Sequence, residues 1–198
     1  FTGSPDLPPR VYDAYLDTGW RPVAGQAGLW EADVPFARET PFRSLFVNGK
    51  RAVRARTPNE GFFRIEGNSP QDKPVKLRFA SGDIRKSWAD SGETEVIALL
   101  AWADFRMYLR NVDEENHTAT LSGNPRPSNQ EANARYFIEN APDSLDAPGE
   151  WQLDRQRGVV RYFARDGENL RTAEVIAPRL EDLFQLKGDF TAKRAVRH

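Results

Sequence analysis

The chain has 198 residues, with 28 Lys or Arg against 29 Asp or Glu, so its formal net charge is -1. This balance gives no overall attraction to nucleic acid or to an anionic membrane. Cysteine is absent and only two histidines occur, which excludes disulfides, thiolate metal sites, a cysteine nucleophile and a histidine-rich metal centre. A chain of this length can bury a core without a cofactor, and we expect neither a metal nor a cofactor.

The first 18 residues contain three prolines and favour neither helix nor strand, so we interpret 1–18 as an extended leader. Short strands are then predicted at Trp20 to Val23 and at Leu29 to Val34, on either side of a glycine-containing turn. The chain begins at Phe1 and shows no basic-then-apolar start resembling a signal peptide. We therefore interpret it as a piece of a longer protein.

The pair Asn48-Gly49 lies between two β-prone runs and predicts a hairpin. A type I′ turn requires positive φ at both central residues, and Asn-Gly meets that requirement better than other pairs. If these two residues form the loop, Val47 faces Lys50 across the hairpin.

Alternation along the second strand of this hairpin predicts two faces. Phe46, Val53 and Ala55 would share one face, and Arg54 and Arg56 would share the other. Two arginines on one strand face form either a solvated edge or a grip for an acidic surface or a sugar.

The rest of the chain is rich in short strand signals. The run from Glu95 to Trp102 is apolar on both alternating faces, which indicates a central strand buried on both sides and leaves a short buried helix open. The segment 80–93 is a candidate for a short helix or a loop. The segment 142–149 is a candidate for a helical turn. The other predicted strands are Phe62 to Glu66, Val75 to Phe79, Phe105 to Arg110, Thr118 to Leu121, Tyr136 to Glu139, Trp151 to Leu153, Val159 to Ala164, Ala173 to Ala177 and Leu183 to Leu186. This pattern predicts an all-β fold, an antiparallel β-sandwich or partly open barrel with one or two short helices.

Glycoside hydrolysis uses a pair of carboxyl groups, one of them kept protonated by an apolar environment. Asp104 near Trp102 and Glu150 beside Trp151 have the local environments that best favour a raised pKa. The alternative is that both are strand-end or turn residues. The two tryptophans lie in apolar alternation and are predicted to be core residues. No spacing singles out a carboxylate pair, so no catalytic residue is assigned.

Sugar-binding sites use an exposed aromatic ring with arginine and amide groups around it. Trp88 lies in a polar segment and is the candidate for such a ring, with Arg54, Arg56 and Asn59 as polar partners. The alternative for Trp88 is that it folds back as a lid on the sandwich.

Three stretches of the chain carry a resemblance to a known family. They read LFVNGKRAVRARTPNEG (Leu45 to Gly61), YFIENAPDSLDAPGEWQLDRQRGVVRYF (Tyr136 to Phe163) and VIAPRLEDLFQLKGD (Val175 to Asp189). They resemble a β-rich auxiliary domain of large bacterial right-handed parallel β-helix proteins, which include glycoside hydrolases such as α-1,3-galactosidases and β-xylosidases. The motifs run in family order and cover most of the chain from Gly19 onward.

The resemblance implies an organisation and a function. Residues 1–18 would be the leader, 19–190 the sandwich or barrel accessory domain, and 191–198 the start of a return to a β-helix that is missing here. The domain would be non-catalytic and carbohydrate-associated, because the family's acid and nucleophile lie on the helix coils. Its partners would be the parent's β-helix domain and an oligo- or polysaccharide, and the parent a secreted or periplasmic glycoside hydrolase.

Two alternatives from other classes stay open. One is a carbohydrate-binding module that uses Trp88 and the face of Arg54 and Arg56. The other is a small glycosidase in its own right, which would require a convergent carboxylate pair about 5 to 10 Å apart in a cleft.

Overall fold

The computed structural model describes residues 19–67, 74–123 and 131–178. The predicted leader at 1–18, the predicted strand at 183–186 and the predicted return at 191–198 lie outside these residues. Nearly all regular structure in the described part is β, arranged in three sheets with antiparallel pairing except for one parallel pair. The predicted all-β sandwich class is confirmed, and none of the sheets in the described ranges closes into a barrel.

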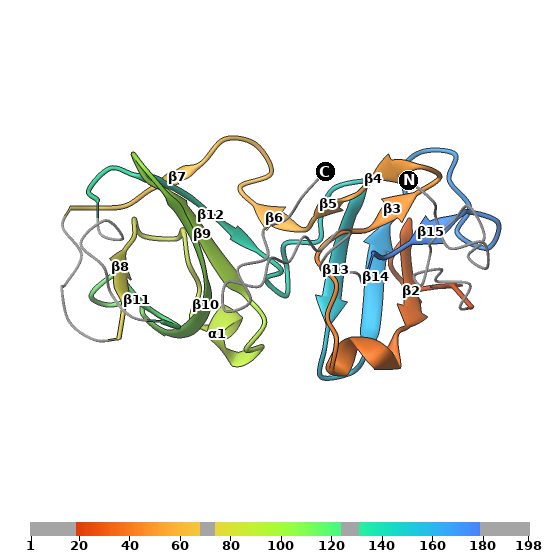
Figure 1. The fold of residues 1–198 in the computed structure, drawn as a ribbon, viewed down its shortest axis with the longest axis horizontal. Coiled ribbons are helices and arrows are strands. Elements are labelled where there is room, and N and C mark those ends of the chain that lie inside the picture. Colours follow the sequence, from red (N-terminus) through yellow and green to blue (C-terminus); the bar gives the residue numbers. More distant parts are fainter. Residues whose placement is uncertain (1–18, 68–73, 124–130, 179–198) are drawn as a thin grey trace, which may run out of the picture.

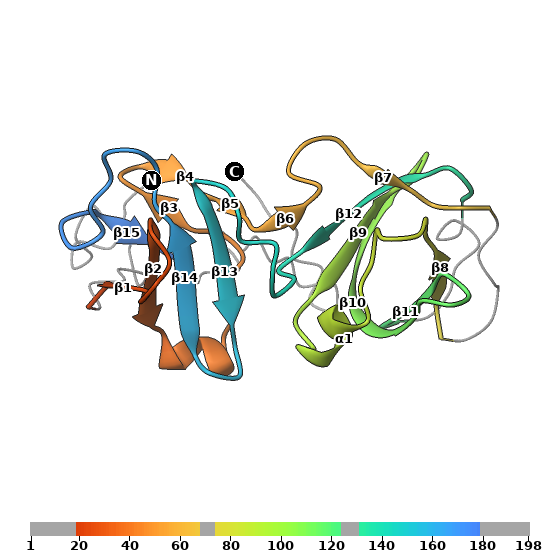
Figure 2. The same ribbon diagram turned by 180° about the vertical axis from the view of Figure 1, so that it is seen from behind.

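The sheets form two lobes (Figures 1 and 2). Lobe A, residues 19–54 and 150–178, contains a five-stranded and a three-stranded sheet and the 3-10 helix Pro35–Arg38. The five-stranded sheet runs in the order β1 (Arg21–Pro22), β2 (Leu29–Asp33), β14 (Val159–Phe163), β13 (Glu150–Asp154) and β5 (Val53–Arg54), and the three-stranded sheet in the order β15 (Val175–Ile176), β3 (Phe46–Val47) and β4 (Lys50–Arg51).

Lobe B, residues 56–67, 74–123 and 131–141, contains one strongly curved sheet and the short helix α1 (Ser87–Asp90). Its strands are, in sheet order, β6 (Arg56–Thr57), β12 (Arg135–Glu139), β9 (Glu95–Leu99), β10 (Asp104–Asp113), β11 (Thr118–Leu121) and β8 (Lys76–Arg78), and β7 (Phe63–Arg64) also pairs with β12.

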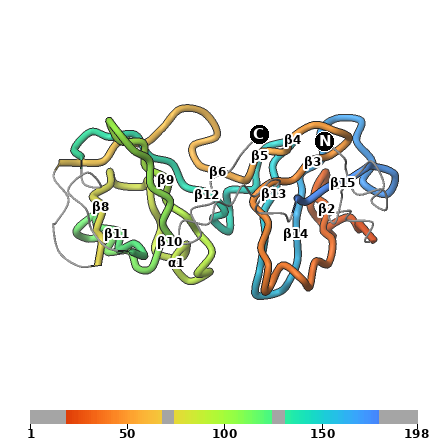
Figure 3. Tube along the Cα trace, viewed as in Figure 1, coloured from red at the N-terminus to blue at the C-terminus, as the bar shows by residue number. Residues whose placement is uncertain are grey.

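The chain crosses between the lobes twice, and the two crossings lie side by side. It leaves lobe A between β5 and β6 and returns between β12 and β13, so that red-to-orange and blue segments share lobe A in Figure 3. Ala55 joins the crossings: its N–H donates to the Trp151 carbonyl at 2.7 Å, and its carbonyl accepts from the Asn140 N–H at 2.8 Å. Residues far apart in the sequence therefore meet at the junction of the lobes.

Each lobe has its own hydrophobic core. In lobe A, Trp151 is fully buried and its ring stacks on Phe42 with 5.2 Å between ring centroids. In lobe B, β9 pairs with β12 on one side and β10 on the other, and its residues Glu95 to Ala98 are all buried. The predicted central strand is thus confirmed over Glu95–Leu99.

The Asn48-Gly49 hairpin is confirmed. Val47 pairs with Lys50, and φ is 50° at Asn48 and 73° at Gly49, as a type I′ turn requires. The Asn48 side chain also accepts a hydrogen bond from the Glu174 N–H at 3.1 Å. This contact ties the hairpin to the segment that leads into β15.

The predicted faces beyond the hairpin are wrong. Val53 is half-exposed whereas Ala55 is fully buried, so the two do not share a buried face. The reason is that the strand is not continuous: β4, β5 and β6 are two-residue strands that belong to three different sheets. Each break turns the chain, and the period of two is lost.

Two other local predictions need correction. Trp102 is 97% exposed, not a core residue, because β9 ends at Leu99 and the chain turns tightly, with the Leu100 N–H donating to the Ala103 carbonyl at 2.8 Å. The segment 142–149 forms turns and bends instead of a helical turn. Gly149 still ends it with φ at 91°, and a Cβ there would lie 2.7 Å from the Arg165 side chain.

Candidate functional site

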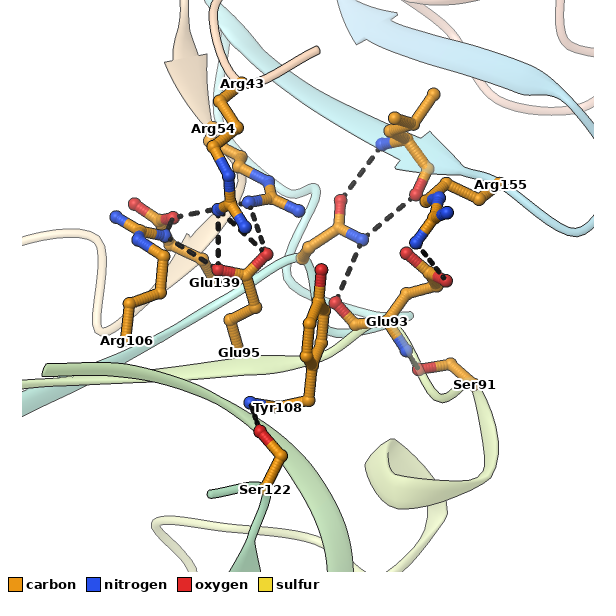
Figure 4. A network of polar contacts seen from close by, with 12 residues as sticks. Arg43, Arg54, Ser91, Glu93, Glu95, Arg106, Tyr108, Ser122, Glu139 and Arg155 are labelled. Carbon is orange, nitrogen blue, oxygen red and sulfur yellow. Dashed lines mark hydrogen bonds and ion pairs between the residues drawn. The ribbon is translucent and has the colours of Figure 1, made fainter. Parts of the chain in front are cut away.

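The junction between the lobes centres on the carboxylate of Glu95, whose side chain is 2% exposed. Three arginines reach it (Figure 4). Arg54 Nη1 donates to Oε1 at 2.9 Å, and Oε2 accepts from Arg43 Nη1 at 2.8 Å and from Arg106 Nη1 at 3.0 Å. Arg43 and Arg54 belong to lobe A and Arg106 to lobe B, so this carboxylate connects the two lobes.

A second carboxylate lies beside the first. Glu139 on β12 is directly opposite Glu95 on β9 in the antiparallel register, where like charges destabilise a sheet. Arg106 forms ion pairs with both carboxylates, and Arg54 Nη1 lies 3.7 Å from Glu139 Oε2. The arginines therefore compensate a repulsion that the sheet register imposes. We call these five residues the arginine clamp.

The clamp holds Glu95 in its ionised form. Burial by itself raises the pKa of this carboxyl, but the charge of Arg54 and the hydrogen bonds from Arg43 and Arg106 outweigh burial, and the net pKa is lowered. A carboxylate with a lowered pKa and both oxygens bonded cannot serve as a proton donor at neutral pH. The role that fits this geometry is to hold the lobes together and to fix the arginines.

A cavity of about 510 Å³ opens next to the clamp. Its wall comes from the segment before β3, from β4 and β5, and from single residues of β10, β12 and β13. The lining residues are Arg43, Ser44, Arg51, Ala52, Val53, Arg54, Arg106, Glu139 and Trp151. Both lobes contribute to this wall, which is therefore complete only when the lobes sit together.

Asn140 forms a second connection between the lobes, immediately after Glu139. Its side-chain amide donates to the Leu153 carbonyl at 3.0 Å and to the Glu93 carbonyl at 3.4 Å, and its oxygen accepts from the Leu153 N–H at 2.9 Å. Asn140 is buried and has a φ of 60°, a conformation that asparagine tolerates better than most residues. These hydrogen bonds tie the crossing from β12 to β13 to a strand of lobe A and to the segment before β9.

Glu150 confirms one part of the sequence prediction: burial raises its pKa, although backbone hydrogen bonds from Asp146, Ala147 and Arg56 oppose the shift. Those bonds occupy both oxygens, at 3.2 Å from the two turn residues and at 3.3 Å from Arg56. This is the alternative that the sequence left open, since Glu150 is the first residue of β13 and has a structural role at the strand end. Asp104 is exposed at the start of β10, close to the exposed Trp102, so the predicted apolar environment around it does not form.

The structure separates the predicted sugar-binding residues. Trp88 is 4% exposed and packs in the core of lobe B, so its predicted exposure is wrong and the alternative that it folds back on the sheet is confirmed. Arg54 is 9% exposed and belongs to the clamp. Arg56 lies over the Phe137 ring at 4.1 Å and donates to the Gly61 carbonyl at 2.7 Å, while the Asn59 amide donates to Asp146 at 2.8 Å. These four residues do not form one face, because Arg54 and Arg56 belong to different sheets.

Sequence reasoning missed most of the clamp. It named Arg54 for a surface role and did not single out Glu95, Arg43, Arg106 or Asn140. One signal was available: Glu95 opens a run predicted to be buried on both faces, and a carboxylate buried there requires a cationic partner. The sequence offers 28 cations and does not say which of them the fold brings near.

Two further findings bear on function. Among the described residues, no group of three or more His, Asp or Glu side chains is placed to hold a metal ion. The helices in the same ranges are too short and too polar to span a lipid bilayer.

The chain was compared with known families, curated proteins and solved structures. A model of the GH141 insertion domain family matches residues 27–165, well over half of the chain. A solved structure described as "Glycoside hydrolase" is similar, with a TM-score of 0.69 and 30% sequence identity, over 88% of this chain and 32% of that one. This chain thus spans about a third of the length of that relative. The search of curated proteins gave no match.

Proposed function

From the finding that this chain belongs to the family of GH141 insertion domains, we propose that it is a non-catalytic, carbohydrate-associated accessory domain of a larger glycoside hydrolase. The similarity over only a third of a glycoside hydrolase supports an accessory role, since the other two thirds of such a protein are available for the catalytic body. The resemblance seen in the sequence extends the proposal to a β-helix catalytic domain as the partner and to a secreted or periplasmic location.

The main support for a non-catalytic role is that the buried carboxylates are engaged in ion pairs and hydrogen bonds within the domain. The carboxylates that the described ranges bury are Glu95 and Glu150. A glycosidase needs one carboxyl group that is protonated and a second one across the scissile bond, both open to substrate. The Glu95 carboxylate is bound by three arginines, and both Glu150 oxygens accept backbone hydrogen bonds. Neither group is free to reach a sugar.

The proposal predicts that the 198-residue chain hydrolyses neither aryl glycosides nor polysaccharides. Release of nitrophenol from a panel of aryl glycosides and of reducing ends from polysaccharides measures this directly. If turnover is seen, Glu150→Gln and Asp104→Asn identify its origin, with the exposed Glu131→Gln as the matched control. Turnover that is lost in Glu150→Gln or Asp104→Asn and kept in Glu131→Gln would overturn the accessory role and support a small glycosidase.

A further inference from the structure

The cavity beside the arginine clamp carries an excess of positive charge. Four arginines line it, Arg43, Arg51, Arg54 and Arg106, against Glu139 in the wall and Glu95 behind it. Its volume of about 510 Å³ lies within the range of small-molecule sites, and the half-exposed Val53 gives part of the wall an apolar surface.

The arginines of the clamp use only one of their nitrogens to bind the carboxylates. Every ion pair of Arg43, Arg54 and Arg106 with Glu95 or Glu139 runs through Nη1. A guanidinium has five N–H donors in a rigid plane, and two neighbouring donors on one edge bind a carboxylate or a similar oxyanion. The Nε and Nη2 donors of these arginines therefore take no part in binding Glu95 or Glu139, and the clamp fixes each guanidinium through one nitrogen.

One of these unused donors is buried. Arg54 Nε has no access to solvent and no partner among the described residues, although the side chain lines the cavity. Buried donors without a partner are rare in native proteins, and such a group calls for a water or an ion close by.

Arg51 adds a cationic group outside the clamp. It is exposed on β4, and its Nη2 donates to Ser44 Oγ, another lining residue, at 3.2 Å. Among the contacts of the described residues, Arg51 pairs with neither clamp carboxylate, so the clamp does not use its charge.

We propose that this cavity binds the anionic group of an acidic sugar unit, a carboxylate or a sulfate, and so selects acidic over neutral saccharides. The inference rests on the proposed carbohydrate-associated role and names its ligand class. The clamp supplies guanidinium groups held in place by Glu95 and Glu139, Arg51 supplies an exposed cation, and Val53 packs against the sugar ring. Because the wall comes from both lobes, binding also requires the lobes to stay in their present arrangement.

Isothermal titration of the 198-residue chain tests the proposal with three probes: trigalacturonate, a sulfated galactose trisaccharide and neutral galactotriose. We expect binding of at least one anionic probe, no measurable binding of galactotriose, and weaker binding in 0.5 M salt. The stronger of the two anionic probes identifies the group. Arg51→Gln should weaken binding about tenfold, the loss expected for one charge-assisted hydrogen bond.

Arg43→Gln is the second variant, and Arg110→Gln is the control. Arg110 is exposed on β10 outside the cavity, so its replacement removes the same charge and should leave the affinity unchanged. Thermal melts of each variant show that it is folded. Three results would overturn the proposal. They are an affinity for galactotriose equal to that for the anionic probes, an equal loss of affinity in Arg110→Gln and Arg51→Gln, and no binding of either anionic probe. Those results would leave the accessory role standing, because that role fails only if the chain turns over a glycoside.

Discussion

Replacing Glu95 by Gln should lower the free energy of unfolding by about 3 kcal/mol at pH 7. Removing one partner of a buried ion pair leaves the other charge uncompensated, at roughly 3 to 5 kcal/mol. The lower end applies because Arg43 and Arg106 are partly exposed, so solvent can hydrate them once the Glu95 charge is removed. Arg54 is buried and would keep only the longer contact with Glu139. Urea unfolding followed by tryptophan fluorescence measures the change.

The control is Asp143→Asn, which removes an ion pair of the same kind, with Arg85, at the surface. Both of those side chains are about half exposed, so the pair should contribute no more than about 1 kcal/mol. Losses of similar size in the two variants would contradict the view that the clamp is the main electrostatic connection between the lobes.

The acid dependence follows from the lowered pKa of Glu95. A group whose pKa is lower in the folded than in the unfolded chain contributes stability above its ordinary value, here 4.5, and loses that contribution as the pH falls through the folded value. The difference in stability between the wild type and Glu95→Gln should therefore be full at pH 7 and shrink below pH 4.5. A difference that stays constant between pH 7 and pH 3 would show that the clamp does not depend on the Glu95 charge.

Asn140→Ala should lower the free energy of unfolding by at least about 3 kcal/mol. The change leaves the buried N–H and carbonyl of Leu153 without partners, and each such group is worth roughly 1 to 3 kcal/mol. It also places Ala in a left-handed conformation, at about 1 kcal/mol. Thermal and urea unfolding of the variant measure the sum.

Asn133→Ala separates these two contributions. Asn133 has a φ of 62°, nearly the same as Asn140, but it is exposed. We expect Asn133→Ala to lower the free energy of unfolding by about 1 kcal/mol, from backbone strain alone. Equal losses in the two variants would mean that the Asn140 side chain does not brace the crossing between the lobes.

The sequence by itself determined the elements whose signals are local. The hairpin at Asn48-Gly49 follows from the φ angles that those two residues tolerate, and the central strand β9 follows from a run that is apolar on both faces. The strands around Trp151 and Val159 follow from alternation, because each has one neighbour close in sequence. The fold class was predicted for the same reason, since many short strands with few helix signals are a local property of the chain.

Only the tertiary structure decided the site. Arg54 was predicted to lie on a strand face with Arg56, but the strand breaks at Ala55 and the two arginines enter different sheets. Arg43, Arg54 and Arg106 are 52, 41 and 11 residues from Glu95 along the chain, and they meet because the two crossings between the lobes lie side by side. An ion pair can form between residues at any separation along the chain. A sequence with nearly equal numbers of cations and anions therefore allows many different ion pairs. The packing of the two hydrophobic cores positions the crossings, and through them it selects these three arginines.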